Sequence, residues 1–108
     1  MPLYLYYRPS FNRSIKRLGS DQKKIVGKIL EALDTYYSSN CSLSEARQIA
    51  PRFFYKQLRK PYYEAGIEGN MRVILRREGS NCIAILAGNH NQIEKFLSQV
   101  EVFPILYY

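Results

Sequence analysis

Hydrophobic and polar positions alternate along this chain with two periods, one typical of strands and one typical of helices. Residues 3–8 are rich in Leu and Tyr and end before Pro9, which indicates a first strand. In residues 10–18 and 20–37 the apolar positions recur every three or four residues, which predicts two amphipathic helices joined at Gly19. Together they form a helical hairpin whose apolar stripe needs a sheet to cover it.

The second half of the chain predicts an antiparallel sheet. Segments rich in β-branched and aromatic residues alternate with turn-forming residues, and the segments are 53–59, 62–67, 71–77 and 82–88. Apolar spacing after Asn91 predicts a last helix, and the polar residues 38–51 predict a loop with one helical turn near its end. The terminal VFPILYY is apolar and broken by Pro104, and it should pack on the sheet or on a partner.

These elements predict one α+β domain over residues 1–108. The expected order is β-α-α-β-β-β-β-α, with a twisted, mainly antiparallel sheet and the helical hairpin packed on one face. A chain of 108 residues is too short for two hydrophobic cores of useful size. The apolar run at residues 3–7 is too short for a signal-peptide core or a membrane span, so we expect a cytoplasmic protein that begins at Met1 and does not bind membranes.

The chain is basic, with 16 Lys and Arg against 9 Asp and Glu and a formal net charge of +7. Such an excess is typical of small domains that bind nucleic acid or an acidic protein, although it also occurs in soluble domains with neither partner. Cys41 and Cys82 form no CxxC pair, and there is a single histidine. This composition argues against a zinc site and against a disulfide scaffold, so we expect no metal and no cofactor.

The strand predicted at residues 71–77 carries arginines. Alternation places Arg72, Ile74 and Arg76 on one side, while the more apolar opposite side fits the helices. On the open face, the planar guanidinium of an arginine presents donors that match a phosphate. The alternative is that both arginines are ordinary surface residues that pair with Glu64 or Glu78.

The polar cluster Gly88–Asn91 follows the last strand and contains the only histidine. With an ordinary pKa of about 6.5, His90 could exchange a proton with a ribose hydroxyl or a leaving oxygen. The alternative is a loop histidine that caps the last helix, and the sequence does not separate the two. Glu94, one helical turn later, could hold the imidazole in one tautomer, act as the acid-base partner, or be an exposed helix charge.

A second basic cluster, Lys56, Arg59 and Lys60, is interleaved with aromatic residues. Aromatic faces beside cations suit stacking on unpaired bases, worth about 1–3 kcal/mol per base. We therefore predict an RNA-binding set of Lys56, Arg59, Lys60, Arg76 and Tyr63. The alternative for the tyrosines is that they are half-buried strand residues.

Four segments together resemble the RelE/ParE superfamily of bacterial type II toxins, which includes plasmid-stabilisation and mRNA-interferase proteins. FNRSIKRL at residues 11–18 and the helix at residues 25–37 are similar to its first two helices. YYEAGIEGNMRVILRREG at residues 62–79 resembles its LYELR…yRV strand pair, and AGNHNQIEKFL at residues 87–97 resembles its closing GHHDEAY segment. The resemblance covers most of the chain and implies the RelE-like fold.

The resemblance also implies a function: the toxin of a toxin–antitoxin system that enters the ribosomal A site and cuts mRNA without a metal. A base activates the ribose 2′-hydroxyl, an arginine stabilises charge on the phosphate, and an acid protonates the leaving 5′ oxygen. By matching position, Arg72 would hold the phosphate, His90 would transfer a proton or contact RNA, and Glu64 would match the glutamate of the strand pair. The implied partners are an acidic or amphipathic antitoxin and mRNA on the ribosome.

Three positions depart from the family pattern. Gly66 stands where a second arginine is usual, Met71 replaces a tyrosine before Arg72, and Glu94 takes the place of the closing tyrosine. Loss of one preorganised charge stabiliser typically costs about 10²–10³ in rate, so we expect reduced mRNA cleavage. Two alternatives stay open: a non-catalytic or gyrase-directed ParE-like toxin that acts by protein binding, with DNA gyrase as partner, and a nonspecific RNA-binding domain.

Overall fold

A mixed five-stranded sheet in the order β1-β5-β4-β3-β2 lies at the centre of the molecule. The computed structural model describes residues 3–106 and the side chains of residues 3–99. β1 and β5 are parallel, and the other neighbours are antiparallel. The strands are β1 (Tyr4–Tyr7), β2 (Phe54–Gln57), β3 (Tyr62–Gly66), β4 (Arg72–Glu78) and β5 (Asn81–Gly88). Every strand predicted from the alternation is therefore confirmed.

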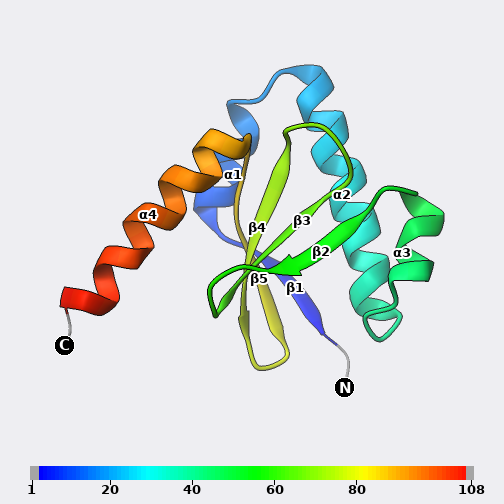
Figure 1. Cartoon of the computed structure of the whole chain (residues 1–108). Helices are drawn as coiled ribbons and strands as arrows, with labels where there is room; N and C mark the ends of the chain where they lie inside the picture. Colours follow the sequence, from blue (N-terminus) through cyan, green and yellow to red (C-terminus); the bar gives the residue numbers. More distant parts are fainter. Residues whose placement is uncertain (1–2, 107–108) are drawn as a thin grey trace.

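The helices within residues 3–106 are α1 (Pro9–Lys16), α2 (Ser20–Ser38), α3 (Leu43–Ile49) and α4 (His90–Leu106). In Figure 1 the sheet runs between α2 on one side and α4 on the other. α3 is longer than the single turn that we predicted. Ser42 caps it by accepting a hydrogen bond from the Glu45 N–H at 3.3 Å, and Ala46 is buried in the main core. Tertiary packing on Ala46 therefore extends the turn into a helix.

The main hydrophobic core lies between the helical hairpin and one face of the sheet. α2 contributes Val26, Ile29 and Leu33, which are spaced three and four residues apart. β4 contributes Val73 and Leu75 from alternate positions. Full burial of each such side chain stabilises the fold by roughly 1.5–3 kcal/mol. The predicted helical stripe and the predicted strand face therefore meet in this core.

The opposite face of the sheet is less open than we predicted. Ile74 lies on this face between Arg72 and Arg76, yet it is fully buried and stands outside the main core. α4 contacts β4 and β5, and its Ile93 is also buried. α4 therefore covers part of this face, and the side chains of Arg72 and Arg76 remain only 21% and 37% exposed.

α4 also continues further than its apolar spacing predicted. The helix includes Pro104 and ends at Leu106, whereas we expected the proline to break this segment. An internal proline removes one backbone hydrogen bond and its ring crowds the carbonyl four residues earlier, so the helix continues here at a local cost. The predicted packing of the VFPILYY segment concerns side chains outside the described ones. No helix within residues 3–106 is both long and apolar enough to cross a bilayer.

A pair of tyrosines closes the main core near the end of α2. The Tyr37 hydroxyl is buried and donates a hydrogen bond to the Tyr55 hydroxyl at 2.9 Å. Burial raises the pKa of Tyr37 far above its ordinary value, and the neighbouring Tyr55 adds to the shift. Burial also raises the pKa of Tyr55. Both hydroxyls therefore stay protonated in the folded protein at neutral pH.

This tyrosine pair predicts a loss of stability at alkaline pH. A group whose pKa is raised by folding stabilises the protein fully below its unfolded pKa, about 10 for tyrosine, and loses that contribution as the pH rises further. We expect the free energy of unfolding to fall above about pH 10, and to fall less steeply in Tyr37→Phe. Urea unfolding at a series of pH values measures both slopes. Equal slopes would show that folding does not raise the pKa of Tyr37.

Candidate functional site

A row of residues crosses the sheet at the start of β4. Phe54 of β2 pairs with Gly66 of β3, and Arg72 of β4 pairs with Gly88 of β5. The register between β3 and β4 places Gly66 beside Arg72. Arg72 therefore has a glycine on either side, so neither neighbouring strand position fills the space around its side chain.

Phe54 and Arg72 fill the space over Gly66. A Cβ atom on Gly66 would lie 2.7 Å from Phe54 Cζ and 2.9 Å from Arg72 Cδ, and real Cβ atoms essentially never come so close. The guanidinium carbon of Arg72 lies 4.9 Å from the centroid of the Phe54 ring. This distance is within the range of about 6 Å for a cation–π contact. Gly66 therefore makes room for the contact between the ring and the guanidinium.

The guanidinium of Arg72 is held through two of its three nitrogens, Nη1 and Nε. Its Nη1 donates hydrogen bonds to the carbonyls of Gly69 and Met71 at 2.7 and 2.8 Å. Gly69 has a φ of 71°, which glycine adopts without strain, and the turn brings its carbonyl back to Arg72. Nε lies 3.4 Å from Oε1 of Glu64, the pairing that the surface alternative predicted. Nη2 donates neither of these two hydrogen bonds, which leaves it as the candidate donor to a ligand.

Glu64 is buried and faces two cations. Its Oε1 lies 3.4 Å from Arg72 Nε, and its Oε2 lies 3.4 Å from Lys56 Nζ. The Lys56 side chain is 62% exposed. A buried carboxylate needs such partners, because an unpaired charge is costly to desolvate. This arrangement favours a role for Glu64 in positioning the two cations over one in proton transfer.

A capping box places His90 at the start of α4, two residues after Gly88. The Gln92 N–H donates to Asn89 Oδ1 at 3.0 Å, and the Asn89 N–H donates to Gln92 Oε1 at 2.8 Å. A Cβ atom on Gly88 would lie 2.5 Å from Gln92 Oε1, so the glycine leaves room for this cap. Because Gly88 pairs with Arg72, His90 and Arg72 lie at the same end of the sheet.

His90 and Glu94 form the contact expected from their spacing. Nε2 of His90 lies 3.0 Å from Oε1 of Glu94, and the two side chains are 64% and 66% exposed. In the neutral imidazole that donates Nε2–H to Glu94, Nδ1 is the nitrogen that accepts a proton. Because both side chains are exposed, the pair adds little to stability. His90 is thus oriented by Glu94 and accessible from solvent.

Met71 reaches the site only through its backbone. Its side chain is buried in the main core, on the side of the sheet away from Arg72. Its carbonyl accepts a hydrogen bond from Arg72 Nη1. The departure at this position therefore removes no side chain from the surface that carries Arg72.

Arg76, Arg59 and Lys60 lie toward the opposite end of the sheet from Arg72. Nε of Arg76 lies 2.7 Å from Oε1 of Glu78, again as the surface alternative predicted. Arg59 and Lys60 lie in the turn that joins β2 and β3. Four residues of β4 separate Arg72 from Arg76, which corresponds to about 13 Å along a strand. The structure therefore divides the predicted RNA-binding cations into two groups.

Tyr63 lies on the other face of the sheet. Its ring stacks on Tyr55 with centroids 5.3 Å apart, and the guanidinium carbon of Arg77 lies 5.5 Å from its centroid. It packs against the main core, whereas the neighbouring Glu64 points to Arg72. Tyr63 therefore shares no surface with Arg72, and its position agrees with the half-buried alternative.

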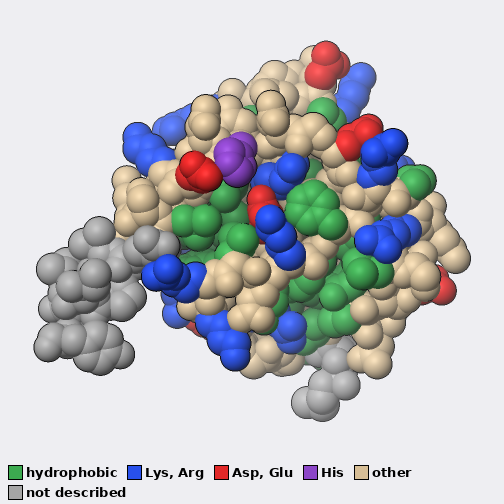
Figure 2. Space-filling model, in the orientation of Figure 1, with side chains coloured by type: hydrophobic (Ala, Val, Ile, Leu, Met, Phe, Trp, Pro, Cys, Tyr) green, Lys and Arg blue, Asp and Glu red, His purple; other side chains and the backbone are tan. Residues whose placement is uncertain are grey.

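Phe54 is one of the aromatic residues interleaved with the second basic cluster, and the sequence analysis did not include it in the predicted site. Figure 2 shows this face, where the histidine, basic side chains and hydrophobic side chains gather near the start of α4. Phe54 and Lys56 are two residues apart on β2, and Gly66 and Glu64 are two residues apart on β3, so the two members of each pair share a face of the sheet. This spacing is a signal from which the face of Phe54 could have been predicted. However, the pairing of a particular aromatic residue with a particular glycine depends on the register, which the alternation does not determine.

No protein-family model matches the sequence, and no curated protein is significantly similar to it. Solved structures do match. A chain of the E. coli DinJ–YafQ toxin–antitoxin complex superposes with a TM-score of 0.62 at 15% identity, over 85% of this chain and 97% of that chain. A chain of the RelB–RelE antitoxin–toxin complex from Methanococcus jannaschii gives 0.59 at 18% identity, over 84% and 96%. The fold is that of the RelE-like toxins.

A third structure, YafQ from E. coli strain BL21(DE3), gives a TM-score of 0.58 at 19% identity, over 84% of this chain and 97% of that chain. The RelE-like fold expected from the short sequence motifs is therefore confirmed. The likeness extends over nearly the whole length of these chains.

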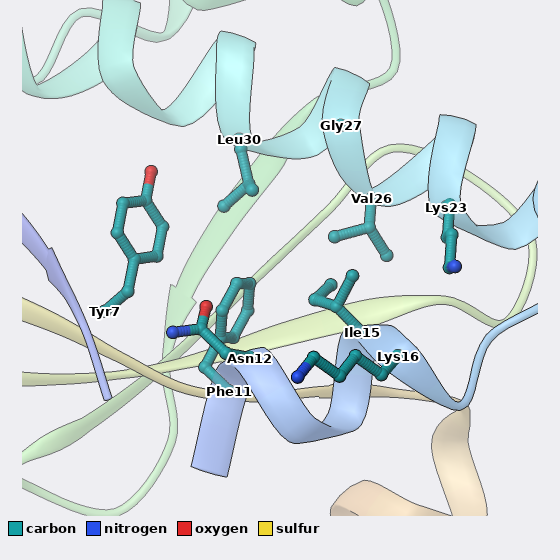
Figure 3. Close-up of a pocket in the computed structure, with 9 residues that line it drawn as sticks. All are labelled: Tyr7, Phe11, Asn12, Ile15, Lys16, Lys23, Val26, Gly27 and Leu30. Carbon is teal, nitrogen blue, oxygen red and sulfur yellow. The ribbon is translucent and has the colours of Figure 1, made fainter. Parts of the chain in front are cut away.

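A second surface of the protein is a cleft of about 640 Å³ between α1 and α2. Figure 3 shows Phe11 and Ile15 of α1 pointing toward Val26 and Leu30 of α2. Basic and small residues complete the lining, with Lys16, Lys23 and Gly27 among them. The cleft is therefore apolar inside and basic at its border.

Proposed function

We propose that this chain is the toxin of a type II toxin–antitoxin pair and that it cleaves mRNA on the ribosome without a metal ion. The observation that carries the proposal is the guanidinium of Arg72, held through Nη1 and Nε at the end of the sheet where α4 starts, with Nη2 as the candidate donor to a phosphate. An arginine is always charged and its planar donors match a phosphate. The RelE-like fold and the net charge of +7 support the same function.

In the proposed reaction His90 and Arg72 have separate tasks. Nδ1 of His90 takes the proton of a ribose 2′-hydroxyl, whose oxygen attacks the adjacent phosphorus and expels the 5′ oxygen, leaving a 2′,3′-cyclic phosphate. Arg72 stabilises the negative charge that builds on the phosphate. Glu94 holds the imidazole through Nε2 and stabilises its positive charge. The carboxylate of Glu64 is paired with two cations and is not assigned the role of the acid. Water therefore protonates the leaving oxygen.

Induction of this chain alone in a bacterial host tests the proposal. We expect growth to stop and new 5′ ends to appear within coding regions. A reporter message and a matched copy without its start codon separate ribosome-dependent cleavage from general RNA degradation, since only the translated copy should be cut. Normal growth with intact message would refute the enzymatic function.

A gyrase-directed or otherwise non-catalytic toxin is the second candidate function. The observation that favours it is the charge compensation at the site, where Glu64 pairs with both Arg72 and Lys56 and Gly66 supplies no second cation. Such a surface suits protein binding better than strong phosphate binding. Growth arrest with uncut mRNA and an induced SOS response would favour this candidate over the ribonuclease.

We further propose that the cleft between α1 and α2 binds a helix of the antitoxin. An amphipathic helix with acidic residues fits both the apolar interior and the border that carries Lys16 and Lys23. The matched DinJ–YafQ and RelB–RelE structures are toxin–antitoxin complexes, which supports a partner of this class for the present chain. The net charge of +7 favours an acidic partner.

Two substitutions of Gly27 separate helix stability from partner binding. Gly27 lies within α2 beside the cleft, and a Cβ atom there would meet nothing within 4 Å. Gly27→Ala should therefore raise the free energy of unfolding by about 0.5–1 kcal/mol. Gly27→Leu should fill the cleft and weaken binding of the antitoxin about tenfold or more. Urea unfolding and titration calorimetry measure the two effects, and unchanged affinity for Gly27→Leu would place the partner elsewhere.

A further inference from the structure

Phe54 lies on the sheet face of Arg72 and outside the main core. The preceding residue, Phe53, is fully buried and belongs to the main core. Alternation along the strand therefore turns Phe54 to the opposite face, where it is half-buried. The two adjacent phenylalanines thus have different surroundings, and the packing that explains Phe53 does not explain Phe54.

The guanidinium of Arg72 lies over the face of the Phe54 ring. The ring occupies the space over Gly66, where a Cβ atom would lie 2.8 Å from its Cε1. The guanidinium carbon lies 4.9 Å from the ring centroid. The other contacts of Arg72, with Glu64 and two backbone carbonyls, are made by its nitrogens Nε and Nη1. The ring adds a contact of another kind, an attraction between its face and the positive charge, which favours one position of the guanidinium.

We propose that Phe54 is a positioning residue: through the space that Gly66 leaves open, its ring holds the Arg72 guanidinium in the orientation that presents Nη2 to an RNA phosphate. The inference rests on the proposed function of Arg72 as the phosphate-binding group. Phe54 and Gly66 then act together. The ring of Phe54 occupies the space over Gly66, the position at which the family resemblance would place a second arginine.

Variants at position 54 distinguish this role from simple packing. An apolar contact tolerates any apolar side chain of similar size, whereas a cation–π contact depends on the electron density of the ring face. Phe54→Tyr keeps that density, and Phe54→Leu keeps the apolar character without the ring. A trifluorinated phenylalanine at position 54 keeps the shape but withdraws the density. This third variant is informative even if Phe54→Leu does not fold.

The first measurement is the order of the Arg72 side chain in the free protein, from NMR relaxation of its Nε–H bond. We expect the order parameter to fall in Phe54→Leu and in the trifluorinated variant, and to stay at the wild-type value in Phe54→Tyr. An unchanged order parameter in both of the first two variants would refute the positioning role. A fall in the free energy of unfolding without this change would mean packing alone, and would refute it equally.

The second measurement is function. RNA affinity is measured with a short single strand that carries 2′-O-methyl groups and so cannot be cleaved, and cleavage is measured on programmed ribosomes. We expect the trifluorinated variant to lose about 2- to 30-fold in affinity or rate, the range of one cation–π contact, and Phe54→Tyr to lose almost nothing. Absence of both activities in the wild type would overturn the proposed function, and the NMR result would still decide the role of Phe54.

Discussion

Replacement of Arg72 by alanine should reduce mRNA cleavage about 100-fold or more and should abolish growth arrest. Arg72 is the only residue at the site whose guanidinium is fixed by an ion pair, two backbone carbonyls and a ring, within the part of the chain that the structure describes. Arg72→Lys keeps the charge but loses the planar fork and the stacking, so we expect an intermediate rate. Mapping of mRNA 5′ ends and single-turnover cleavage on ribosomes measure both.

The control for this prediction must exclude unfolding and a general loss of charge. Arg72→Ala leaves the buried Glu64 with Lys56 alone, and a buried pair broken on one side typically costs about 3–5 kcal/mol. The double variant Arg72→Ala, Glu64→Gln removes that unpaired charge and should regain stability but not cleavage. Lys24→Ala removes one exposed positive charge far from the site and should cleave normally. Substantial cleavage by the folded double variant would contradict the role of Arg72.

Gly66→Ala should be costly although it adds a single methyl group. The new Cβ would lie 2.7 Å from Phe54 Cζ and 2.9 Å from Arg72 Cδ, so at least one of these side chains must move. Overpacking of this kind typically destabilises a protein by about 1–3 kcal/mol. Because the displaced groups include Arg72, we also expect cleavage to fall about tenfold or more. Urea unfolding and the ribosomal cleavage assay measure the two effects.

Gly27→Ala is the matched control for Gly66→Ala, because the same methyl group meets open space there and should stabilise the protein. Adding Phe54→Ala to Gly66→Ala makes room for the methyl group, so the two changes should be less harmful together than their sum. For the same steric reason, Gly66→Arg should lower activity and not restore it. Full activity of Gly66→Arg would show that Phe54 and Arg72 can separate freely, contrary to the packing described above.

The helices and strands were predictable because they depend on residues that are close along the chain. The stripe of α2, at Val26, Ile29 and Leu33, and the alternation of β4 are local patterns, and both formed as expected. The short motifs around Arg72 and His90 likewise led to the RelE-like fold. The lengths of α3 and α4 were underestimated. Local periodicity indicates neither the tertiary packing of Ala46 nor the continuation of a helix through Pro104.

The site was predictable only in part, because alternation assigns a face and not a neighbour. Arg72 and His90 were identified, and they lie at the same end of the sheet. Tyr63 was grouped with the basic residues, yet the face that it occupies belongs to the main core. Ile74 was expected on an open face, and α4 buries it.

The sequence by itself determined the class of this protein: one set of helical stripes, one set of alternating strands and an excess of positive charge, all properties of residue order and composition. Only the tertiary structure decided that Phe54, Gly66 and Arg72 form one row, and that Glu64 pairs with two cations. The physical reason is register. A shift of one residue between β2 and β3 would preserve every local pattern in the chain and would still remove the ring from beneath the arginine.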